Sequence, residues 1–252
     1  MSTNKIAVVT GGSRGLGKNM SLHLAGKGVD VILTYNSNEA DAKETVAAIQ
    51  ALGRKAAAIQ LSTSDTSGFE SFFSRLSAVL QQEFGRDRFD YLVNNAGIGI
   101  NAPFAETTEE QFDQLMNIQF RSVFFLTQRA LPLLNNGGGI VNISTGLARF
   151  STPGYAAYAS MKGAIETLTK YQAKELGARG IRVNVVAPGP IATEFGGGHL
   201  VNPQVQQALG GLTALGRIGQ PDDIGRVVAF LCSEEAGWVN AQRIEVSGGM
   251  NL

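Results

Sequence analysis

The sequence predicts an α/β fold, a doubly wound parallel sheet of about seven strands with helices on both faces. Short β-branched runs alternate with longer stretches of helical periodicity, which is typical of a parallel sheet with helical crossovers. The short runs are continuously apolar, as in strands that are buried on both faces. The 252 residues show no internal repeat, linker or low-complexity segment, so we expect a single domain over residues 1–252.

Each expected element follows from its own pattern. Seven apolar runs predict strands at Ile6–Thr10, Asp30–Tyr35, Lys55–Gln60, Asp90–Asn94, Gly139–Ser144, Ile181–Val186 and Arg243–Val246. Helical periodicity predicts helices at roughly Leu16–Lys27, Glu39–Leu52, Ser67–Phe84, Glu109–Leu133, Tyr155–Gly177 and Pro221–Leu231. The segment from about Thr193 to Leu215 is the least regular, and it contains three consecutive glycines.

Composition excludes several classes of protein. The chain is 44% hydrophobic and 17% charged, which is typical of a soluble globular protein. Lys+Arg and Asp+Glu both number 21, so bulk charge favours neither nucleic acid nor an anionic membrane as a partner. One cysteine, Cys232, excludes an internal disulfide, and two distant histidines do not make a usual zinc site, so we expect no metal. No signal-peptide core or membrane-length apolar run occurs, and we expect a cytoplasmic protein.

A glycine-rich turn follows the first expected strand and opens the first expected helix. It reads Thr10-Gly11-Gly12-Ser13-Arg14-Gly15-Leu16-Gly17. Gly11 and Gly15 allow the backbone to turn tightly and to approach a pyrophosphate, and Gly17 allows close packing of helix on strand. The N–H groups at the start of the helix are donors for phosphate. The turn therefore predicts a dinucleotide site, in preference to a purely structural turn.

The end of the second strand indicates which dinucleotide binds. An NAD site usually has a carboxylate here that holds the ribose hydroxyls. This strand ends Thr34-Tyr35-Asn36-Ser37 without an acid. Arg14 can pair with a 2′-phosphate through charge-assisted hydrogen bonds, although a solvated surface arginine is the alternative. The sequence favours NADP(H) over NAD.

Tyr158 and Lys162 are candidates for acid–base chemistry. Four residues apart on a helix, they lie on one face and can reach one site. A free tyrosine has a pKa of about 10, and a nearby ammonium favours the phenolate and lowers that pKa. The spacing alone is weak evidence, and the glycine-rich turn strengthens it. Together they predict hydride transfer between a nicotinamide cofactor and a carbonyl or alcohol.

With these motifs the chain resembles the classical short-chain dehydrogenases/reductases over essentially its full length, and it is similar to 3-oxoacyl carrier-protein reductases and related NADP-dependent carbonyl reductases. The order and spacing of several motifs agree with this family: Thr10-Gly11-x-x-x-Gly15-x-Gly17, Asn94-Asn95-Ala96-Gly97, Asn117, Ser144-Thr145, Tyr158-x-x-x-Lys162, Pro188-Gly189 with Thr193, Gly216 to Pro221, and Ser247-Gly248-Gly249. The resemblance implies a Rossmann-type domain with a cofactor half at roughly 1–135 and catalytic and substrate elements at roughly 136–252. The irregular segment at about 193–215 would be a substrate lid.

The resemblance also implies roles for individual residues. Tyr158 would protonate the carbonyl oxygen, or act as the base in oxidation, without a metal. Lys162 would lower the pKa of Tyr158 and hold the nicotinamide ribose. Asn117 would hold a water that links Lys162 to solvent, with a polar residue that bends or decorates a helix as the alternative. Thr193 would bond the carboxamide, although it could equally begin a helix as an N-cap.

The remaining cofactor contacts that the resemblance implies follow the strand ends. They are Gly11, Ser13, Arg14, Gly15, Leu16, Gly17, Tyr35, Asn36, Ser37, Ser62, Thr63, Asn95, Ala96, Gly97, Tyr158, Lys162, Pro188, Gly189, Ile191 and Thr193.

The chain departs from the family pattern at two positions. The family usually has a serine 13 residues before the tyrosine, and Thr145 stands here with Ser144 before it. Adjacent strand residues point to opposite faces, so we favour Thr145 over Ser144 as the residue that faces the substrate oxygen. After the third strand, Ser62 stands where an acid often contacts adenine, and Asp65 comes three residues late.

The resemblance further implies a homotetramer built on a four-helix interface. The helices with Asn117 and Tyr158 are expected to have apolar or small outer faces, with Phe112, Phe120, Phe124, Ala156, Ala159 and Ala164. The partner would be a small carbonyl or alcohol substrate. The alternatives are an NAD-linked alcohol or sugar dehydrogenase and a non-catalytic nucleotide-sensing protein. The loop at Arg149–Tyr155 contains one charged residue, Arg149, which could simply face solvent.

Overall fold

A seven-stranded parallel sheet forms the centre of the molecule, with strand order β3-β2-β1-β4-β5-β6-β7. The computed structural model describes residues 4–252. The strands are β1 Ile6–Val9, β2 Asp30–Tyr35, β3 Ala56–Gln60, β4 Phe89–Asn94, β5 Leu134–Ile143, β6 Arg182–Pro188 and β7 Arg243–Val246. Every neighbouring pair in the sheet is parallel. The predicted α/β class, the strand number and the Rossmann-type topology are therefore confirmed.

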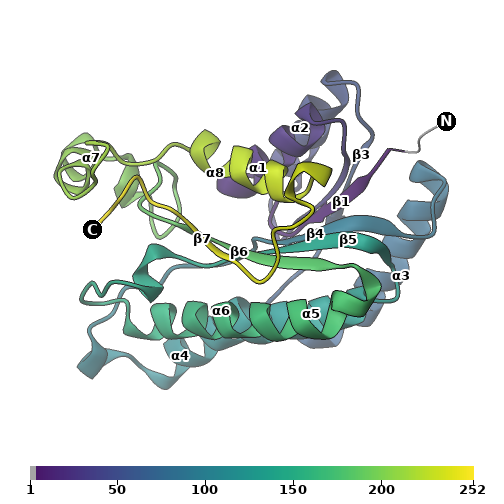
Figure 1. The fold of residues 1–252 in the computed structure, drawn as a ribbon. Helices are drawn as coiled ribbons and strands as arrows, with labels where there is room; N and C mark the ends of the chain where they lie inside the picture. The colour runs from purple at the N-terminus through teal and green to yellow at the C-terminus, as the bar shows by residue number, and fades with distance from the viewer. Residues whose placement is uncertain (1–3) are drawn as a thin grey trace.

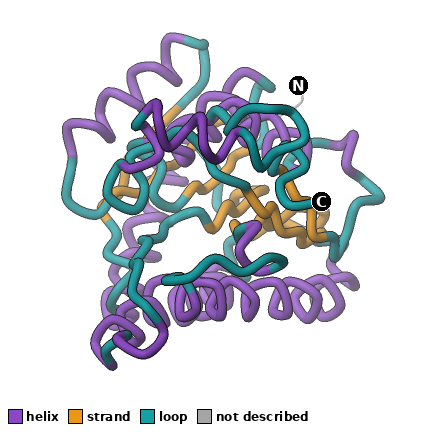
Figure 2. Tube along the Cα trace, turned by 90° about the vertical axis from the view of Figure 1, so that its left-hand side faces the viewer, coloured by secondary structure: helices purple, strands orange, loops and turns teal. Residues whose placement is uncertain are grey.

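Two helical layers cover the sheet (Figures 1 and 2). The helices are α1 Gly15–Gly26, α2 Glu39–Ala51, α3 Phe69–Val79, α4 Glu109–Leu115, α5 Ser122–Ala130, α6 Ala156–Leu176, α7 Pro203–Gly210 and α8 Pro221–Leu231. Helices α1, α2 and α8 pack on one face of the sheet, and α3, α5 and α6 pack on the other. Nearly all residues of β1, β2, β4 and β6 are buried, which explains why these strands read as continuous apolar runs, whereas β7 at the sheet edge is half-buried.

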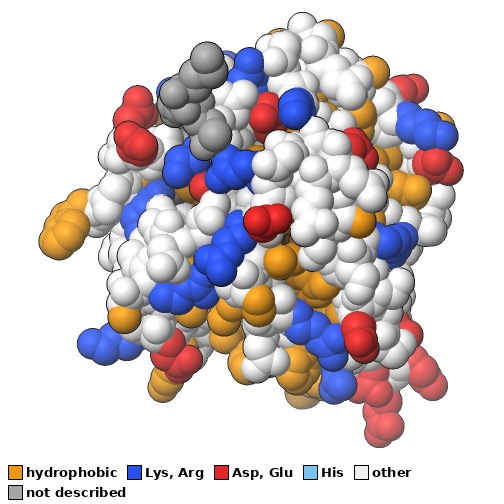
Figure 3. Space-filling view, turned by 90° about the vertical axis from the view of Figure 1, so that its right-hand side faces the viewer, with side chains coloured by type: hydrophobic (Ala, Val, Ile, Leu, Met, Phe, Trp, Pro, Cys, Tyr) orange, Lys and Arg blue, Asp and Glu red, His pale blue; other side chains and the backbone are white. Residues whose placement is uncertain are grey.

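The surface carries no strong excess of either charge on the face shown in Figure 3. Lys and Arg side chains stand among Asp and Glu, and apolar side chains are exposed in the lower part of this face. Among residues 4–252, no helix is long and apolar enough to cross a membrane.

The structure corrects two helix predictions. The expected helix at Glu109–Leu133 is interrupted between α4 and α5 by a wider turn at Met116–Arg121, where the Ser122 N–H bonds the Asn117 carbonyl five residues back. The expected irregular segment contains the helix α7. Asn202 caps α7 by accepting a hydrogen bond from the Gln204 N–H at 2.9 Å, and Pro203 occupies its first position.

Ala241, just before β7, has a strained backbone. Its φ is +60°, in the left-handed region that costs a residue with a Cβ about 1–2 kcal/mol. Its N–H donates to the Val183 carbonyl at 2.9 Å, which holds the residue in this conformation beside β6. The strained conformation of Ala241 therefore accompanies the hydrogen bond that connects the start of β7 to β6.

Ala241→Gly is expected to raise the free energy of unfolding by about 1 kcal/mol. Glycine adopts positive φ without strain, and this gain exceeds the cost of its larger conformational entropy in the unfolded chain. For a chain of this size the melting temperature should rise by about 2–4 °C, measured by thermal unfolding. Ala51→Gly at the end of α2 is the matched control and should lower the melting temperature. A melting temperature that Ala241→Gly leaves unchanged or lowers would show that the strain is absent.

Candidate active site

The carboxyl ends of β1, β4, β5 and β6 bring the predicted site residues to one edge of the sheet. The glycine-rich turn follows β1, Asn95 follows β4, Ser144 and Thr145 follow β5, and Gly189 follows β6. In α/β sheets this edge is where ligands bind. Figure 1 shows α7 and the C-terminus projecting together at one end of the molecule, away from the N-terminus.

The glycine-rich turn is held in an open loop above β1. Gly11 and Gly15 have φ of +64° and +54°, so both positions require glycine. A Cβ on Gly17 would overlap the Gly11 carbonyl oxygen, whereas a Cβ on Gly15 would meet nothing within 4 Å. Helix α1 begins with no side-chain cap, which leaves its first N–H groups free to bind an anion. These features fit a dinucleotide phosphate.

Asn95 connects this turn to the end of β4. Its Nδ2 donates to the Thr10 carbonyl at 2.8 Å and to the Gly11 carbonyl at 3.1 Å. The Thr10 hydroxyl oxygen in turn accepts from the N–H groups of Asn95 and Ala96, at 2.9 and 3.0 Å. The β1 and β4 loops are thus one hydrogen-bonded unit, which brings Asn95, Ala96 and Gly97 close to the turn.

The residues expected at the adenosine side lie at the surface. Asn36 and Ser37 are exposed, and Tyr35 is half-buried. Arg14 is exposed and, within residues 4–252, its side chain makes no hydrogen bond or ion pair, so it is free to meet a ligand. After β3, the Ser62 and Ser64 hydroxyls lie 2.9 Å apart, while Asp65 accepts from the Ser67 N–H and so caps the following turn.

Tyr158 and Lys162 lie one turn apart on α6, and both are buried. The Thr145 side chain hydrogen-bonds the Tyr158 hydroxyl. Burial raises the pKa of Tyr158 above its usual value, and the hydrogen bond from Thr145 acts in the opposite direction. The Lys162 Nζ lies 5.8 Å from the centre of the Tyr158 ring and donates to the Ile143 carbonyl at 2.9 Å.

The expected lowering of the Tyr158 pKa by Lys162 is not found. Burial lowers the pKa of Lys162 itself to about 7, so near neutral pH its charge is only partly present. Its bond to Ile143 also directs the amine towards the strand end. Desolvation is the largest cause of both pKa shifts, and an attraction between the Lys162 ammonium and the Tyr158 phenolate contributes to neither.

Ser144 and Thr145 point to different sides of the strand end. The Ser144 Oγ donates to Glu166 Oε1 at 2.7 Å, away from Tyr158. The Thr145 Oγ1 lies at Tyr158 and also accepts from the Leu147 N–H at 3.3 Å. The geometry favours Thr145 as the residue that faces the site, because the Ser144 hydroxyl is directed to Glu166.

Asn117 is half-buried in the wider turn between α4 and α5, which packs against α6. Leu115 and Met116 contact the cluster of Tyr158 and Met161 from this turn. The turn departs from α-helical hydrogen bonding at Asn117, which fits a polar residue that bends the helix, so the water-binding role of Asn117 stays a prediction.

The end of β6 approaches β7 closely. A Cβ on Gly189 would lie 2.8 Å from Ser247 Cα, so the position requires glycine. Ile191 is buried and bridges to Gly219. Thr193 is also buried and its hydroxyl donates to the Ile191 carbonyl at 3.5 Å. No helix begins at Thr193, so the N-cap interpretation is wrong.

Aromatic and aliphatic side chains pack around the Tyr158 ring. The Tyr158 ring centre lies 6.4 Å from that of Tyr155 and 6.2 Å from that of Phe195. Phe195 reaches the site from the expected lid. Three further apolar residues pack around Tyr155 and Tyr158, and no sequence motif marked them: Ile98, Ile100 and Leu147.

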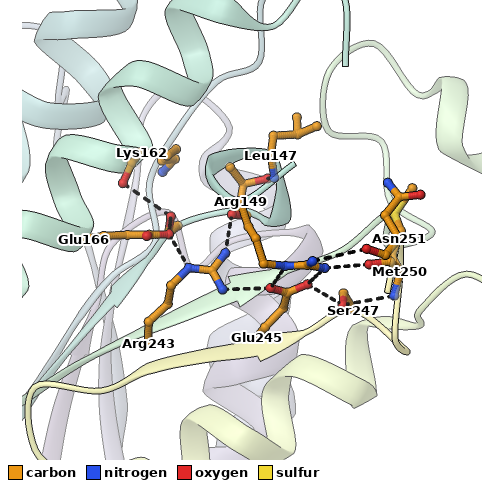
Figure 4. A network of polar contacts seen from close by, with 11 residues as sticks. Leu147, Arg149, Lys162, Glu166, Arg243, Glu245, Ser247, Met250 and Asn251 are labelled. Atoms are coloured by element: carbon orange, nitrogen blue, oxygen red, sulfur yellow. Dashed lines mark hydrogen bonds and ion pairs between the residues drawn. The ribbon is translucent and has the colours of Figure 1, made fainter. Parts of the chain in front are cut away.

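Arg149 is exposed, as its surroundings in the sequence suggested, but its guanidinium is also paired within the protein. Its Nε and Nη2 donate to the two carboxylate oxygens of Glu245, at 2.6 and 2.7 Å (Figure 4). The partner is 96 residues away in the sequence, so no local pattern could have identified it.

Comparison with known proteins relates the chain to several reductases. A family model described as Enoyl-(Acyl carrier protein) reductase matches residues 11–251. The chain is 41% identical to an uncharacterized oxidoreductase of Methylorubrum extorquens, over 98% of this chain and 97% of that one. It is 34% identical to hydroxynaphthalene reductase of Aspergillus fumigatus, over 95% of this chain and 90% of that one.

Two solved structures are similar over nearly the whole chain. LugOII, described as a promiscuous reductase that catalyses keto-reduction at C1 during lugdunomycin biosynthesis, is 37% identical with a TM-score of 0.93, covering 98% of this chain and 97% of that one. The landomycin C-6 ketoreductase LanV, solved with NADP and rabelomycin, is 34% identical with a TM-score of 0.90, covering 98% and 96%.

Proposed function

Because this chain belongs to the short-chain dehydrogenase/reductase family, we propose that it is an NADP(H)-dependent oxidoreductase that reversibly reduces a ketone or aldehyde to an alcohol. The observation that carries this proposal is the hydrogen bond between Thr145 and Tyr158, with Lys162 one turn further along α6, at the sheet edge that bears the glycine-rich turn. The relatives that are named as ketoreductases support the direction of reduction.

The residues around the glycine-rich turn would hold the cofactor. The uncapped first turn of α1 offers N–H donors to the pyrophosphate, and Arg14 offers a guanidinium to the 2′-phosphate. Crystals of LanV contain NADP, which supports the same choice here. Lys162, Pro188, Gly189, Ile191 and Thr193 would line the nicotinamide side.

When bound, NADPH supplies the hydride. Tyr158 donates the proton to the carbonyl oxygen, and the Thr145 hydroxyl, which lies at Tyr158, donates its hydrogen bond to that oxygen. The raised pKa keeps Tyr158 protonated at neutral pH, which is the state that an acid requires for reduction. Lys162 and a water held near Asn117 return a proton to Tyr158 from solvent.

The substrate is an uncharged ketone on a fused aromatic ring system. Tyr155, Phe195 and Leu147 present apolar surface around Tyr158, and flat aromatic substrates stack well on such side chains. The names of the relatives from Aspergillus fumigatus and of LanV support this class. Assays of a panel of fused-ring, aliphatic and charged ketones with NADPH test the proposal. Cofactor binding without turnover of any ketone would favour a nucleotide-sensing protein instead.

The protein is expected to be a homotetramer. Phe112 and Phe124 on α4 and α5 and Tyr171 on α6 are exposed on neighbouring helices, which leaves apolar area for another copy. Phe120, expected on the same outer face, packs inward against the Tyr158 cluster, so it does not belong to this surface. The cytoplasmic location and the division into a cofactor half and a catalytic half stay predictions.

Light scattering at micromolar concentration should give the tetramer mass, and Phe124→Glu should shift it towards smaller species, because a carboxylate would be desolvated in the contact. Leu52→Glu, at the end of α2 beyond the other face of the sheet, is the control and should leave the mass unchanged. A monomer mass for the unmodified protein would contradict the tetramer.

A further inference from the structure

Four charged side chains of alternating sign form a continuous network beneath the candidate active site (Figure 4). Arg243 Nε donates to Glu166 Oε1 at 2.7 Å, and Arg243 Nη1 donates to Glu245 Oε2 at 2.8 Å. Glu245 also receives the two bonds from Arg149. The network joins α6, β7 and the loop after Thr145, which are distant in the sequence.

One end of this network holds the strand end that bears Thr145. Arg243 Nη2 donates to the Thr145 carbonyl at 3.2 Å. The Ser144 hydroxyl donates to the same Glu166 oxygen that Arg243 binds. Glu166 lies one turn after Lys162 on α6, so it fixes the strand end relative to the helix with Tyr158 and Lys162.

The other end of the network holds the C-terminal segment Gly248–Asn251. Arg149 donates to the Met250 carbonyl at 2.6 Å and to the Asn251 carbonyl at 3.3 Å. This segment pairs with Leu212–Leu215 at the end of the expected lid, where the Ala214 N–H donates to the Gly249 carbonyl at 3.2 Å. Arg149 therefore has a role at the lid, whereas Arg243 contacts the catalytic strand end directly.

The two arginines and the two glutamates of the network balance each other's charge, and three of the four side chains are largely buried. The exposed fractions of the Arg243, Glu166 and Glu245 side chains are 23%, 17% and 18%. Burial would raise the pKa of Glu245, but the hydrogen bonds from Arg149, Arg243 and Ser247 outweigh it and lower that pKa to about 2. Glu245 is therefore ionised throughout the neutral range and keeps both arginines in place.

We propose that Arg243 is a positioning residue for the carbonyl reduction, and that it acts through Thr145. Its guanidinium fork fixes the Thr145 carbonyl and, through Glu166, the neighbouring Ser144 side chain, so that the Thr145 hydroxyl is directed at Tyr158. The inference rests on the proposed function, because it assigns Arg243 a purpose in that same reaction. Small displacements of positioned groups have large kinetic effects, up to about 10²-fold for 1 Å.

The test compares Arg243→Met in two backgrounds. With Thr145 present, kcat for ketone reduction with NADPH should fall about tenfold or more, while the Kd of NADPH stays unchanged, because Arg243 lies away from the glycine-rich turn. In a Thr145→Ala background the same substitution should change kcat by only about a factor of two, since the group that Arg243 positions is gone. Equal factors in the two backgrounds, or no loss in the first, would overturn the proposal.

Hydrogen–deuterium exchange supplies a measurement that is independent of activity. Arg243→Met should increase exchange in the peptide that covers residues 145–150, because the Leu147 and Ala148 N–H groups bond Thr145. Arg179→Met is the matched control. Arg179 also binds backbone carbonyls, those of Leu131 and Leu134, but at the opposite ends of the strands. It should alter neither this exchange nor the kcat, and an equal effect of both variants would refute a specific role.

Two outcomes separate this proposal from the proposed function. If the unmodified protein reduces no ketone, the proposed function is wrong. Hydrogen–deuterium exchange in residues 145–150 then tests by itself whether Arg243 orders the strand end. If the unmodified protein is active, and Arg243→Met either lowers kcat equally in both backgrounds or does not lower it with Thr145 present, only the positioning role fails. Should Arg243→Met not fold, Arg243→Lys replaces it in both backgrounds, because lysine keeps the charge but lacks the planar fork. Arg243→Lys must then also lower kcat by a larger factor with Thr145 present than in the Thr145→Ala background.

Discussion

Tyr158→Phe is expected to lower the turnover number for ketone reduction by about 10²–10⁴-fold, the usual effect of removing a general acid. The substitution keeps the ring, which packs between Tyr155 and Phe195, and removes only the hydroxyl that bonds Thr145. NADPH binding should survive, because the glycine-rich turn and Arg14 are untouched. Steady-state rates and cofactor titration measure the two effects separately.

Tyr155→Phe is the matched control for this experiment. Tyr155 belongs to the same aromatic cluster and also has a phenol, but no hydrogen bond joins it to Thr145 among the described contacts. It should retain most of the activity. A Tyr158→Phe enzyme with more than about a tenth of the original turnover would mean that another group supplies the proton.

Arg14→Ala is expected to lower kcat/KM with NADPH by about ten- to a hundredfold and to leave kcat/KM with NADH nearly unchanged. One charge-assisted hydrogen bond is worth about 1.5–3 kcal/mol, and each 1.4 kcal/mol corresponds to about tenfold. Arg14 is exposed and has no partner within residues 4–252, so its substitution removes no internal contact that would confuse the result. Initial rates with both cofactors give the ratio.

Two variants complete the cofactor experiment. Tyr35→Asp places a carboxylate at the end of β2 and should narrow or reverse the preference for NADPH, because the carboxylate repels a 2′-phosphate and binds ribose hydroxyls. Arg54→Ala, at a half-buried arginine just before β3 that bonds the Gly28 carbonyl, should change neither efficiency. Equal losses with NADPH and NADH on substitution of Arg14 would refute the assignment.

The sheet and the glycine-rich turn could be predicted because their signals are local. A strand buried on both faces must be apolar along its length, and all seven such runs became strands. Gly11 and Gly15 are required by their positive φ, and Gly17 is required by the close approach of the helix to the turn. Any sequence that forms this turn must meet these requirements, so the glycines are visible in the sequence. The spacing of Tyr158 and Lys162 likewise follows from helix geometry.

The parts that sequence reasoning missed depend on contacts between distant segments. The pairing of Arg149 and Arg243 with Glu245 and Glu166 needs α6 and β7 to meet, and no periodicity encodes that. The amine of Lys162 was expected to act on Tyr158, and only the fold shows that the Ile143 carbonyl receives it. The short helix α7 had a usable signal in Asn202-Pro203, which three nearby glycines obscured.

The separation of 98 residues between Thr145 and Arg243 has a consequence for biosynthesis. A ribosome releases the chain from its N-terminus at about 5–20 residues per second, so the turn that Asn95 braces can form while much of the protein is still being made. Thr145 is synthesised 98 residues before Arg243, and until Arg243 has emerged the Thr145 carbonyl lacks the guanidinium that holds it. The glycine-rich turn can therefore form during synthesis, whereas the catalytic strand end is held only after Arg243 has also been released.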